Sequence, residues 1–182
     1  MKKDFMKAMF LMLCAVFAFT FTACSDDDDP VDDAATQVAG SYSGTLEVFI
    51  GAMGTDPVAE DSKTINVVKN TANSIDLVIS NFSISIPAFQ ASVDLGTVTI
   101  SNCALTGSDG NYSFAGSIRI EDVVVPFLGN SMQTDYCEVT FTNATINGNT
   151  MTLPLTVNAV LPNGSSISEQ LQGITVDFTG TK

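Results

Sequence analysis

The chain contains no histidine and no tryptophan, and its basic residues are scarce. Without histidine there is no Ser-His-Asp or Cys-His catalytic arrangement, no histidine-ligated zinc site and no histidine general base. Seven lysines and arginines stand against twenty acidic residues in 182, a formal net charge of −13. Because a polyanion repels a phosphate backbone, we expect no nucleic-acid partner.

The carboxylates show no pattern typical of catalysis or metal binding. Glu60-Asp61 and Glu121-Asp122 are adjacent acids in or beside expected loops, where both side chains normally face water, so neither pair favours a glycosidase. Asp109 is the one acid of its turn, whereas calcium takes six or more oxygen ligands. We therefore predict a protein that is not an enzyme and that has no metal site and no cofactor.

The first 23 residues are typical of a cleaved secretory signal peptide. Lys2, Lys3 and Lys7 precede an apolar stretch at 9–21, which is too short to remain as a membrane span. Removal of residues 1–23 takes away three lysines and one acid and leaves a net charge of −15.

Cys24 follows this leader directly, after the small residue Ala23. The arrangement resembles the lipobox of bacterial lipoproteins, in which the cysteine becomes an acylated N-terminus, although Phe21 stands where Leu is usual. The five residues that follow resemble the export signal of Bacteroides-type surface lipoproteins: Ser25, Asp26, Asp27, Asp28 and Asp29. The resemblance implies a lipid-anchored outer-membrane protein at the cell surface, with the periplasmic face as the alternative. An ordinary signal cut elsewhere and a solvated acidic linker are the simpler interpretations.

Residues 24–37 are rich in acids and small side chains. Such a segment buries too little apolar surface to order itself, so we predict a flexible tether there. Residues 38–182 then remain as one domain with a single core.

The domain shows a repeat of two residues. Leu46, Val48 and Ile50, for example, alternate with neighbours on the opposite face, the period of a strand with one wet face. Turn residues interrupt the pattern at 70–73, 107–111 and 147–149. The pattern predicts an all-β domain with strands at 41–51, 62–69, 74–84, 92–105, 112–121, 135–146, 150–160 and 169–181.

The connections between these strands alternate in length. The three tight turns fall at one end of a meander, and the longer links at 52–61, 85–91, 122–134 and 161–168 fall at the other. A closed end and an open mouth favour a single eight-stranded antiparallel up-and-down barrel, whose interior holds side chains or one small ligand. A β-sandwich is the alternative. The tether leaves from the closed end, so the mouth faces away from the membrane.

Three segments carry a family resemblance: Gly40-Ser41-Tyr42-Ser43-Gly44, Asn81-Phe82-Ser83 and the last seven residues, 176–182. They resemble the calycin-like β-barrel lipoproteins of Bacteroides-type bacteria over about residues 38–182. The resemblance implies the barrel fold and an outer-membrane location, and little about chemistry. Gly40 and Gly44 are interpreted as structural, where the barrel closes.

Two mouth links are unusually apolar, at 84–89 and 123–132. They either fold over the barrel end as a plug or form an entrance or partner surface. The candidate walls of that surface are Phe89, Phe127, Leu128 and Met132. We predict either a binding module for one small apolar or glycan-derived ligand, or a non-catalytic interaction protein with a filled barrel that docks another outer-membrane component.

Cys103 and Cys137 are the cysteines left in the domain, in a compartment where a disulfide persists. They fall on strands four and six of the meander, about 10 Å apart at roughly 4.8 Å per strand, beyond the reach of a bridge. Cys103 also shares a face with Thr97 and Thr99, whereas Cys137 shares one with Val139. We predict that the two are not bridged, unless the strand order or register differs.

Overall fold

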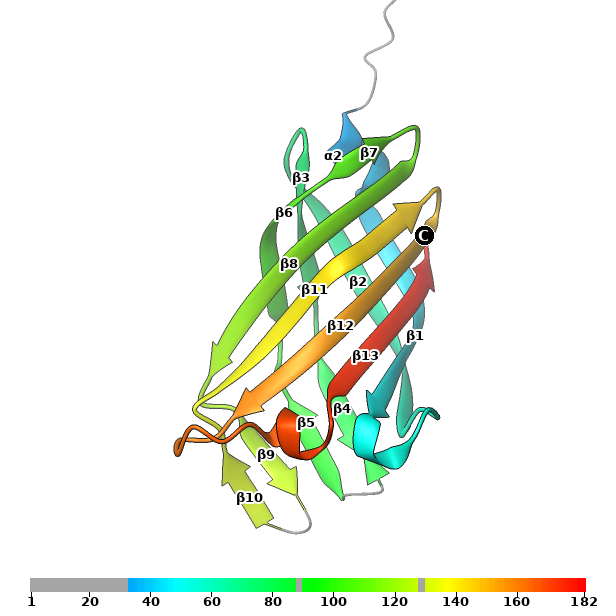
Figure 1. Ribbon diagram of the computed structural model, residues 1–182. Helices are drawn as coiled ribbons and strands as arrows, with labels where there is room; N and C mark the ends of the chain where they lie inside the picture. Colours follow the sequence, from blue (N-terminus) through cyan, green and yellow to red (C-terminus); the bar gives the residue numbers. More distant parts are fainter. Residues whose placement is uncertain (1–32, 88–89, 128–129) are drawn as a thin grey trace, which may run out of the picture. The chain divides into compact units, whose positions relative to one another are not determined.

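The computed structural model describes residues 33–87, 90–127 and 130–182. Strands dominate (Figure 1). The elements are α2 (Ala34–Val38), β1 (Gly40–Ile50), η2 (Gly51–Met53), β2 (Ala59–Thr71), β3 (Ser74–Ile79), β4 (Ser83–Ile86), β5 (Ala91–Asp94), β6 (Val98–Ala104), β7 (Thr106–Ser108), β8 (Asn111–Glu121), β9 (Val124–Phe127), β10 (Asn130–Gln133), β11 (Tyr136–Asn147), β12 (Thr150–Val160), α3 (Ile167–Gln170) and β13 (Ile174–Thr181). Among the described residues, no helix is long and apolar enough to cross a membrane.

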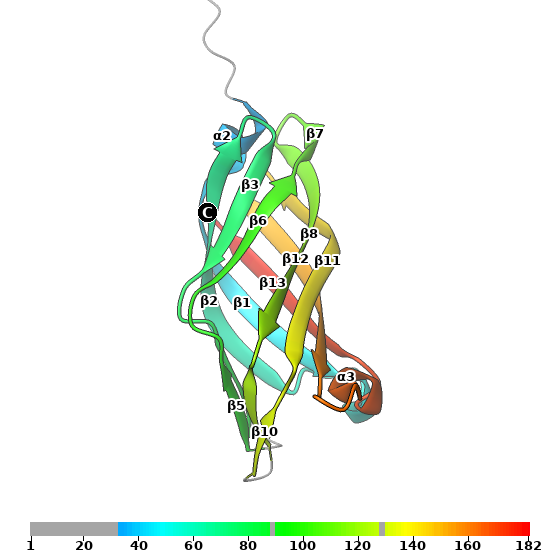
Figure 2. The same cartoon turned by 90° about the vertical axis from the view of Figure 1, so that its left-hand side faces the viewer.

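The main sheet has nine antiparallel strands in the order β6-β3-β2-β1-β13-β12-β11-β8-β7. The first and last long strands, β1 and β13, pair along their length, from Ser43 with Thr181 to Ile50 with Ile174. The sheet curls into a barrel that is nearly closed (Figures 1 and 2). Its seam lies between β6 and β8, which pack through side chains instead of a hydrogen-bonded ladder. The predicted all-β barrel is therefore confirmed, with short β7 as an added ninth strand.

The predicted separation of short and long connections is also found. The β2–β3, β7–β8 and β11–β12 turns lie at the end that carries α2, and η2, the β4–β5 hairpin, the β9–β10 hairpin and α3 lie at the other end (Figure 1). Two predicted strands are each broken in two, since 74–84 becomes β3 and β4, and 92–105 becomes β5 and β6. The predicted link at 122–134 is itself a hairpin.

Residues 33–37, which the sequence places in the flexible tether, are ordered here. Asp33 caps α2 by accepting a hydrogen bond from the Thr36 amide, and its carboxylate pairs with Lys69. Ala35 and Val38 are fully buried. The Tyr42 hydroxyl donates to the Val38 carbonyl over 2.9 Å. Small apolar side chains and a capping carboxylate are enough to seat this helix on the closed end, so the tether prediction is wrong for its last residues.

Large side chains fill the barrel towards its closed end. The bulkiest of the fully buried ones are Tyr42, Phe178, Leu46, Ile50, Ile65, Ile75, Leu77, Ile100, Ile146, Met151, Leu153 and Val38. Phe114 and Phe141 meet edge to face, with ring centroids 5.8 Å apart, a favourable geometry for aromatic pairs.

A bulge corrects the predicted orientation of Cys103. Asn102 adopts a left-handed φ of 61°, and the Asp76 carboxylate accepts a hydrogen bond from its amide over 2.9 Å. The β3–β6 register shifts between Ile75 and Leu77, and Cys103 turns inward to 1% exposure. A bulge adds one residue to a strand and so reverses the facing of the residues beyond it. The prediction that the two cysteines are unbridged is confirmed, since both are free.

Candidate functional site

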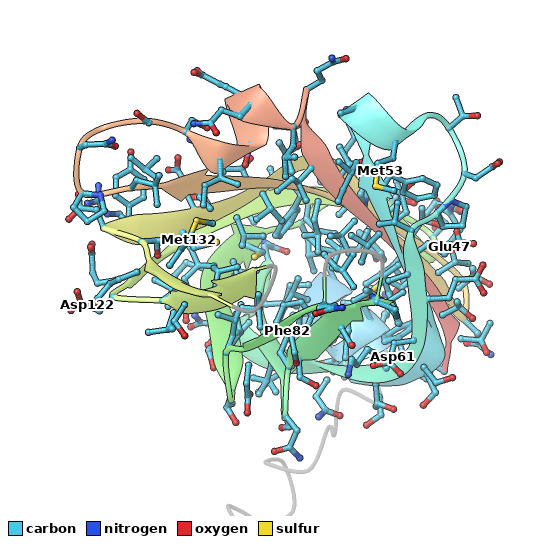
Figure 3. The ribbon with its side chains drawn as sticks, turned by 90° about the horizontal axis from the view of Figure 1, so that it is seen from below. Glu47, Met53, Asp61, Phe82, Asp122 and Met132 are labelled. Carbon is cyan, nitrogen blue, oxygen red and sulfur yellow. The ribbon has the colours of Figure 1, made fainter. Side chains whose placement is uncertain are left out.

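An apolar cavity of about 110 Å³ lies inside the mouth end of the barrel. All of its lining residues are apolar or cysteine, and they come from barrel strands, both mouth hairpins and α3. They are Val48, Ile50, Phe82, Ile86, Val93, Leu95, Val123, Val125, Met132, Cys137, Val139, Val157, Ala159, Ile167, Leu171, Ile174 and Val176. We call this cavity the mouth pocket. Figure 3 views the molecule from this end: Phe82 lies near the middle of the ring of strands, and Glu47 and Asp122 lie at its outer edge.

The β4–β5 hairpin is held over the pocket by its base. The Phe82 amide donates to the Gly96 carbonyl over 2.6 Å, and the Leu95 amide donates to the Phe82 carbonyl over 2.8 Å. Asn81 takes a left-handed φ of 52°, which bends the chain out of β3 before the hairpin starts. The bend lets Phe82, 5% exposed, turn into the interior. The hairpin is thus a separate two-stranded sheet joined to the barrel at a fixed point.

The β9–β10 hairpin has a matching base. Thr134 is fully buried, and both its amide and its hydroxyl donate to the Val123 carbonyl, over 2.9 and 2.8 Å. Asp122 supplies a left-handed bend, with φ 56°. Across the hairpin Val125 is paired with Met132, and both line the pocket. This arrangement turns one face of the hairpin towards the cavity.

The short helix α3 forms a third side. Ser166 caps it by accepting from the Glu169 amide over 3.1 Å. The Ser168 hydroxyl donates to the Val157 carbonyl over 2.7 Å and accepts from the Ala159 amide over 3.2 Å. These hydrogen bonds satisfy backbone polar groups of β12 at the point where its pairing with β13 ends. They also hold Ile167 and Leu171 against the pocket.

The size and lining of the mouth pocket limit what it can hold. An apolar cavity of about 150 Å³ stays dry and holds a benzene-sized guest, whereas drug-sized ligands occupy roughly 300–1,000 Å³. At about 110 Å³ the pocket suits a short alkyl segment or a small ring. A buried hydroxyl would find no partner among the lining side chains, which costs about 1–3 kcal/mol. The lining would therefore suit a hydrocarbon group better than a polar one.

A second hollow adjoins the mouth pocket and shares Val48 with it. It has a volume of about 360 Å³, and Asp61, Ser85 and Pro87 are part of its wall. Lys63 pairs with Asp61 over 2.7 Å, and this contact lowers the pKa of Asp61 below its usual range. The hollow offers polar groups beside the apolar pocket.

Of the four residues predicted to form the entrance or partner surface, only Met132 and Phe127 lie in the described part of the chain. Met132 lines the mouth pocket, as expected. Phe127 lies in β9, where its backbone is paired with Asn130, while Phe89 and Leu128 lie outside the described residues, as do Cys24 and the export signal Ser25–Asp29. The sequence prediction missed the strand contribution, above all Val157, Ala159 and Ile174. Their period-two pattern showed a buried face, but not which part of it borders a cavity.

None of the paired carboxylates singled out in the sequence lines the mouth pocket, although Glu60 and Asp61 line the adjoining hollow. Asp61 pairs with Lys63, and Glu121 accepts from the Arg119 guanidinium over 2.6 Å. Arg119 also stacks on Tyr136, 3.6 Å from its ring centroid. Within the described residues, no three Cys, Asp or Glu side chains gather where they could hold a metal ion.

Cys137 and Met132 are the sulfur-containing residues that line the mouth pocket. Burial raises the pKa of the Cys137 thiol to about 11, and burial, with a smaller effect of Asp76, raises that of Cys103 to about 11. At pH 8 only about one thiol in a thousand is then ionised, against roughly a quarter for a free cysteine, and the thiolate is the reactive form.

Both thiols should therefore react with iodoacetamide more than about a hundredfold more slowly in the folded protein than in urea. In the folded protein the rate should rise about tenfold per pH unit between pH 8 and 10, because the pKa values lie above that range. Peptide mapping by mass spectrometry identifies the labelled residue. Rapid labelling of folded protein at pH 8 would contradict this burial, and unreactive cysteines in urea would indicate a disulfide.

This fold and this pocket define an antiparallel β-barrel closed by side chains at one end and hollow at the other. Residues 38–181 match the family model described as the calycin-like beta-barrel domain. The chain therefore belongs to the calycin-like β-barrel domain family. The comparison with curated proteins found no match.

A solved structure supports the same fold. The crystal structure titled as a "putative outer membrane protein" of Bacteroides fragilis NCTC 9343 is similar over 81% of this chain, with a TM-score of 0.53 and 17% sequence identity. The match covers 52% of that protein's chain, so this chain spans about half of its length. At this identity the likeness shows the fold alone.

Proposed function

We propose that this protein is an outer-membrane lipoprotein, anchored through Cys24, whose barrel binds one small apolar molecule at its mouth. The mouth pocket carries the proposal, because seventeen apolar or sulfur-bearing residues from the barrel strands, both mouth hairpins and the α3 region converge on one cavity. Well-formed apolar pockets are the usual sites for small ligands. The lining favours a hydrocarbon group over a glycan-derived one, and the adjoining hollow with Asp61 would receive a polar end.

The location rests on the leader, Cys24 and the acidic run Ser25–Asp29, and a fold shared with a protein titled as an outer membrane protein agrees with it. Acyl chains on Cys24 would hold the protein to the membrane. Helix α2, which follows the tether, lies at the closed end of the barrel (Figure 1), so the mouth would face away from the anchor. Fractionation of a Cys24→Ala variant tests the anchor: release into the soluble fraction supports it, and retention in the membrane contradicts it.

We propose a binding role in place of catalysis. The pocket presents hydrocarbon and one protonated thiol, and general acid–base catalysis needs a titratable group poised near the working pH. A docking role for the mouth has weaker support. The large apolar side chains exposed there include Met53 and Val124, at 47% and 50%, and scattered exposed residues of this kind are common on any protein.

Calorimetric titration with straight-chain alcohols from butanol to decanol tests the ligand class. Each buried methylene contributes about 0.8 kcal/mol, so affinity should rise about fourfold per carbon and then level off when the cavity is full. That plateau should appear within the series, because the pocket is small. Absence of saturable binding, or an affinity that does not change with the chain length of the alcohol, would contradict an apolar ligand and favour the docking role.

A further inference from the structure

The outer wall of the barrel carries a hollow that the mouth pocket does not explain. Two shallow grooves, of about 350 and 300 Å³, lie on the outside of β11, β12, β13 and the end of β1. They share Thr175 and Asp177, so they form one continuous depression. We call it the wall groove. Its exposed residues, among them Thr156, Thr175 and Asp177, point away from the core, while the lining also includes the buried Phe141 and Leu155. None of its residues belongs to the wall of the mouth pocket.

The strand register arranges the groove in two rows. In the first row Phe49 pairs with Thr175, Thr175 with Thr156, and Thr156 with Thr140. This row presents three hydroxyls in line beside one half-buried aromatic ring. Four neighbouring strands at about 4.8 Å each make it about 14 Å long.

The second row explains why the wall is hollow. Asp177 is paired with Pro154 on one side and with Glu47 on the other. Proline cannot donate a ladder hydrogen bond and is normally excluded from central strands unless a bulge accompanies it. Here the β11–β12 register shifts between Thr140 and Thr145, opposite Pro154. The bulge leaves Thr142 and Asn143 exposed at the rim of the depression.

The polar groups of the groove are available. Within the described residues, the side chains of Thr156, Thr175 and Asp177 form no hydrogen bond or ion pair. The rim at the other end is held firmly, because the Gly51 amide donates to the Gly173 carbonyl over 3.0 Å and the Ala52 amide to the Leu171 carbonyl over 2.9 Å. The groove therefore combines a rigid backbone with uncommitted hydroxyl and carboxylate groups.

From this geometry we infer that the wall groove binds a short neutral oligosaccharide. A sugar has hydroxyls that both donate and accept, and Thr175 and Thr156 match them, while the Asp177 carboxylate accepts two hydroxyl hydrogens. The partly exposed ring of Phe49 and the face of Pro154 suit the C–H faces of sugar rings. The length of the groove fits two or three rings. Acidic sugars are excluded, because Asp177 and Glu47 lie together on a strongly anionic protein.

This site is independent of the proposed mouth ligand, and its test is separate. The complete mature lipoprotein, labelled with ¹⁵N in detergent micelles, is titrated with maltotriose, cellotriose or xylotriose up to about 20 mM, well above a millimolar Kd. At least one of the three should give saturable amide shifts at residues 155–156 and 175–177. Absence of saturable shifts with all three, or shifts confined to the mouth pocket, would overturn the inference.

Matched threonine variants make the test specific. The double substitution Thr156→Val and Thr175→Val removes two groove hydroxyls and should weaken binding about tenfold. Thr152→Val with Thr179→Val is the control, because this pair is also exposed and directly opposed on β12 and β13 but lies outside the groove. Valine keeps the shape and strand preference in both. Equal effects of the two double variants would overturn the site even if a saccharide binds.

Discussion

Val125→Phe is expected to lower the affinity for an alcohol such as octanol by more than about tenfold. Val125 is half-buried and lines the mouth pocket opposite Met132. Phenylalanine adds four carbon atoms, which occupy the space of at least two ligand methylenes, and each methylene is worth about 0.8 kcal/mol. Titration calorimetry of the variant and the parent protein measures the loss.

Val124→Phe is the matched control for this substitution. Val124 is the neighbour of Val125 on β9, is 50% exposed and lies on the opposite face of the strand. The added ring then meets solvent, so octanol affinity should change by less than about twofold. If the two variants bind octanol equally well, the alcohol does not occupy the mouth pocket, and the function proposed for it fails.

Gly44→Ala should destabilise the fold by about 3 kcal/mol or more. A Cβ at this position would lie 1.9 Å from the Thr179 carbonyl oxygen and 2.4 Å from the Gly180 Cα. Both obstacles are backbone, so β1 and β13 would have to separate where the first and last long strands join. Urea unfolding followed by circular dichroism measures the loss as a lower midpoint.

Ser43→Ala provides the comparison for that measurement. Ser43 is exposed, and its hydroxyl shares a hydrogen bond with that of Thr64 over 2.9 Å, an exposed contact of small net value. The variant should stay within about 0.5 kcal/mol of the parent. A Gly44→Ala protein as stable as Ser43→Ala would show that the two strands do not approach as closely as described.

The role of Gly44 illustrates what the sequence could and could not predict. Alternation of apolar and polar residues predicts the strands, and turn residues predict which ends are short, because both signals are local. The glycines of the first strand were correctly interpreted as structural. The reason at Gly44, however, is the approach of Gly180 in β13, which is 136 residues further on in the chain, and this approach follows only from the strand pairing.

Bulges account for the main errors in the fold. The inward turn of Cys103 depends on one left-handed residue, Asn102, held by Asp76 from the neighbouring strand. The alternation of apolar and polar residues along one strand cannot predict this contact with a neighbouring strand, and so it cannot predict the bulge. The sequence prediction also missed the two mouth hairpins and α3. Each strand of these hairpins, and α3 itself, has only four residues, which is too short to show a periodic pattern in the sequence.

The candidate site was partly predictable because the apolar links at the mouth stood out in the sequence. Val123, Val125 and Met132 lie in one of them and line the pocket. Six further lining residues come from β11, β12 and β13, whose inward residues look alike along their whole length. Only the placement of α3 and the hairpins decides where side chains fill the barrel and where space remains.

The most direct test of the mouth pocket is native mass spectrometry of the protein isolated from the cells that make it. We expect a one-to-one adduct of a small apolar molecule, present in the parent and in Val124→Phe, and absent from Val125→Phe. A parent protein that carries no adduct and also fails to bind any alcohol of the series would contradict a ligand-binding role for this barrel.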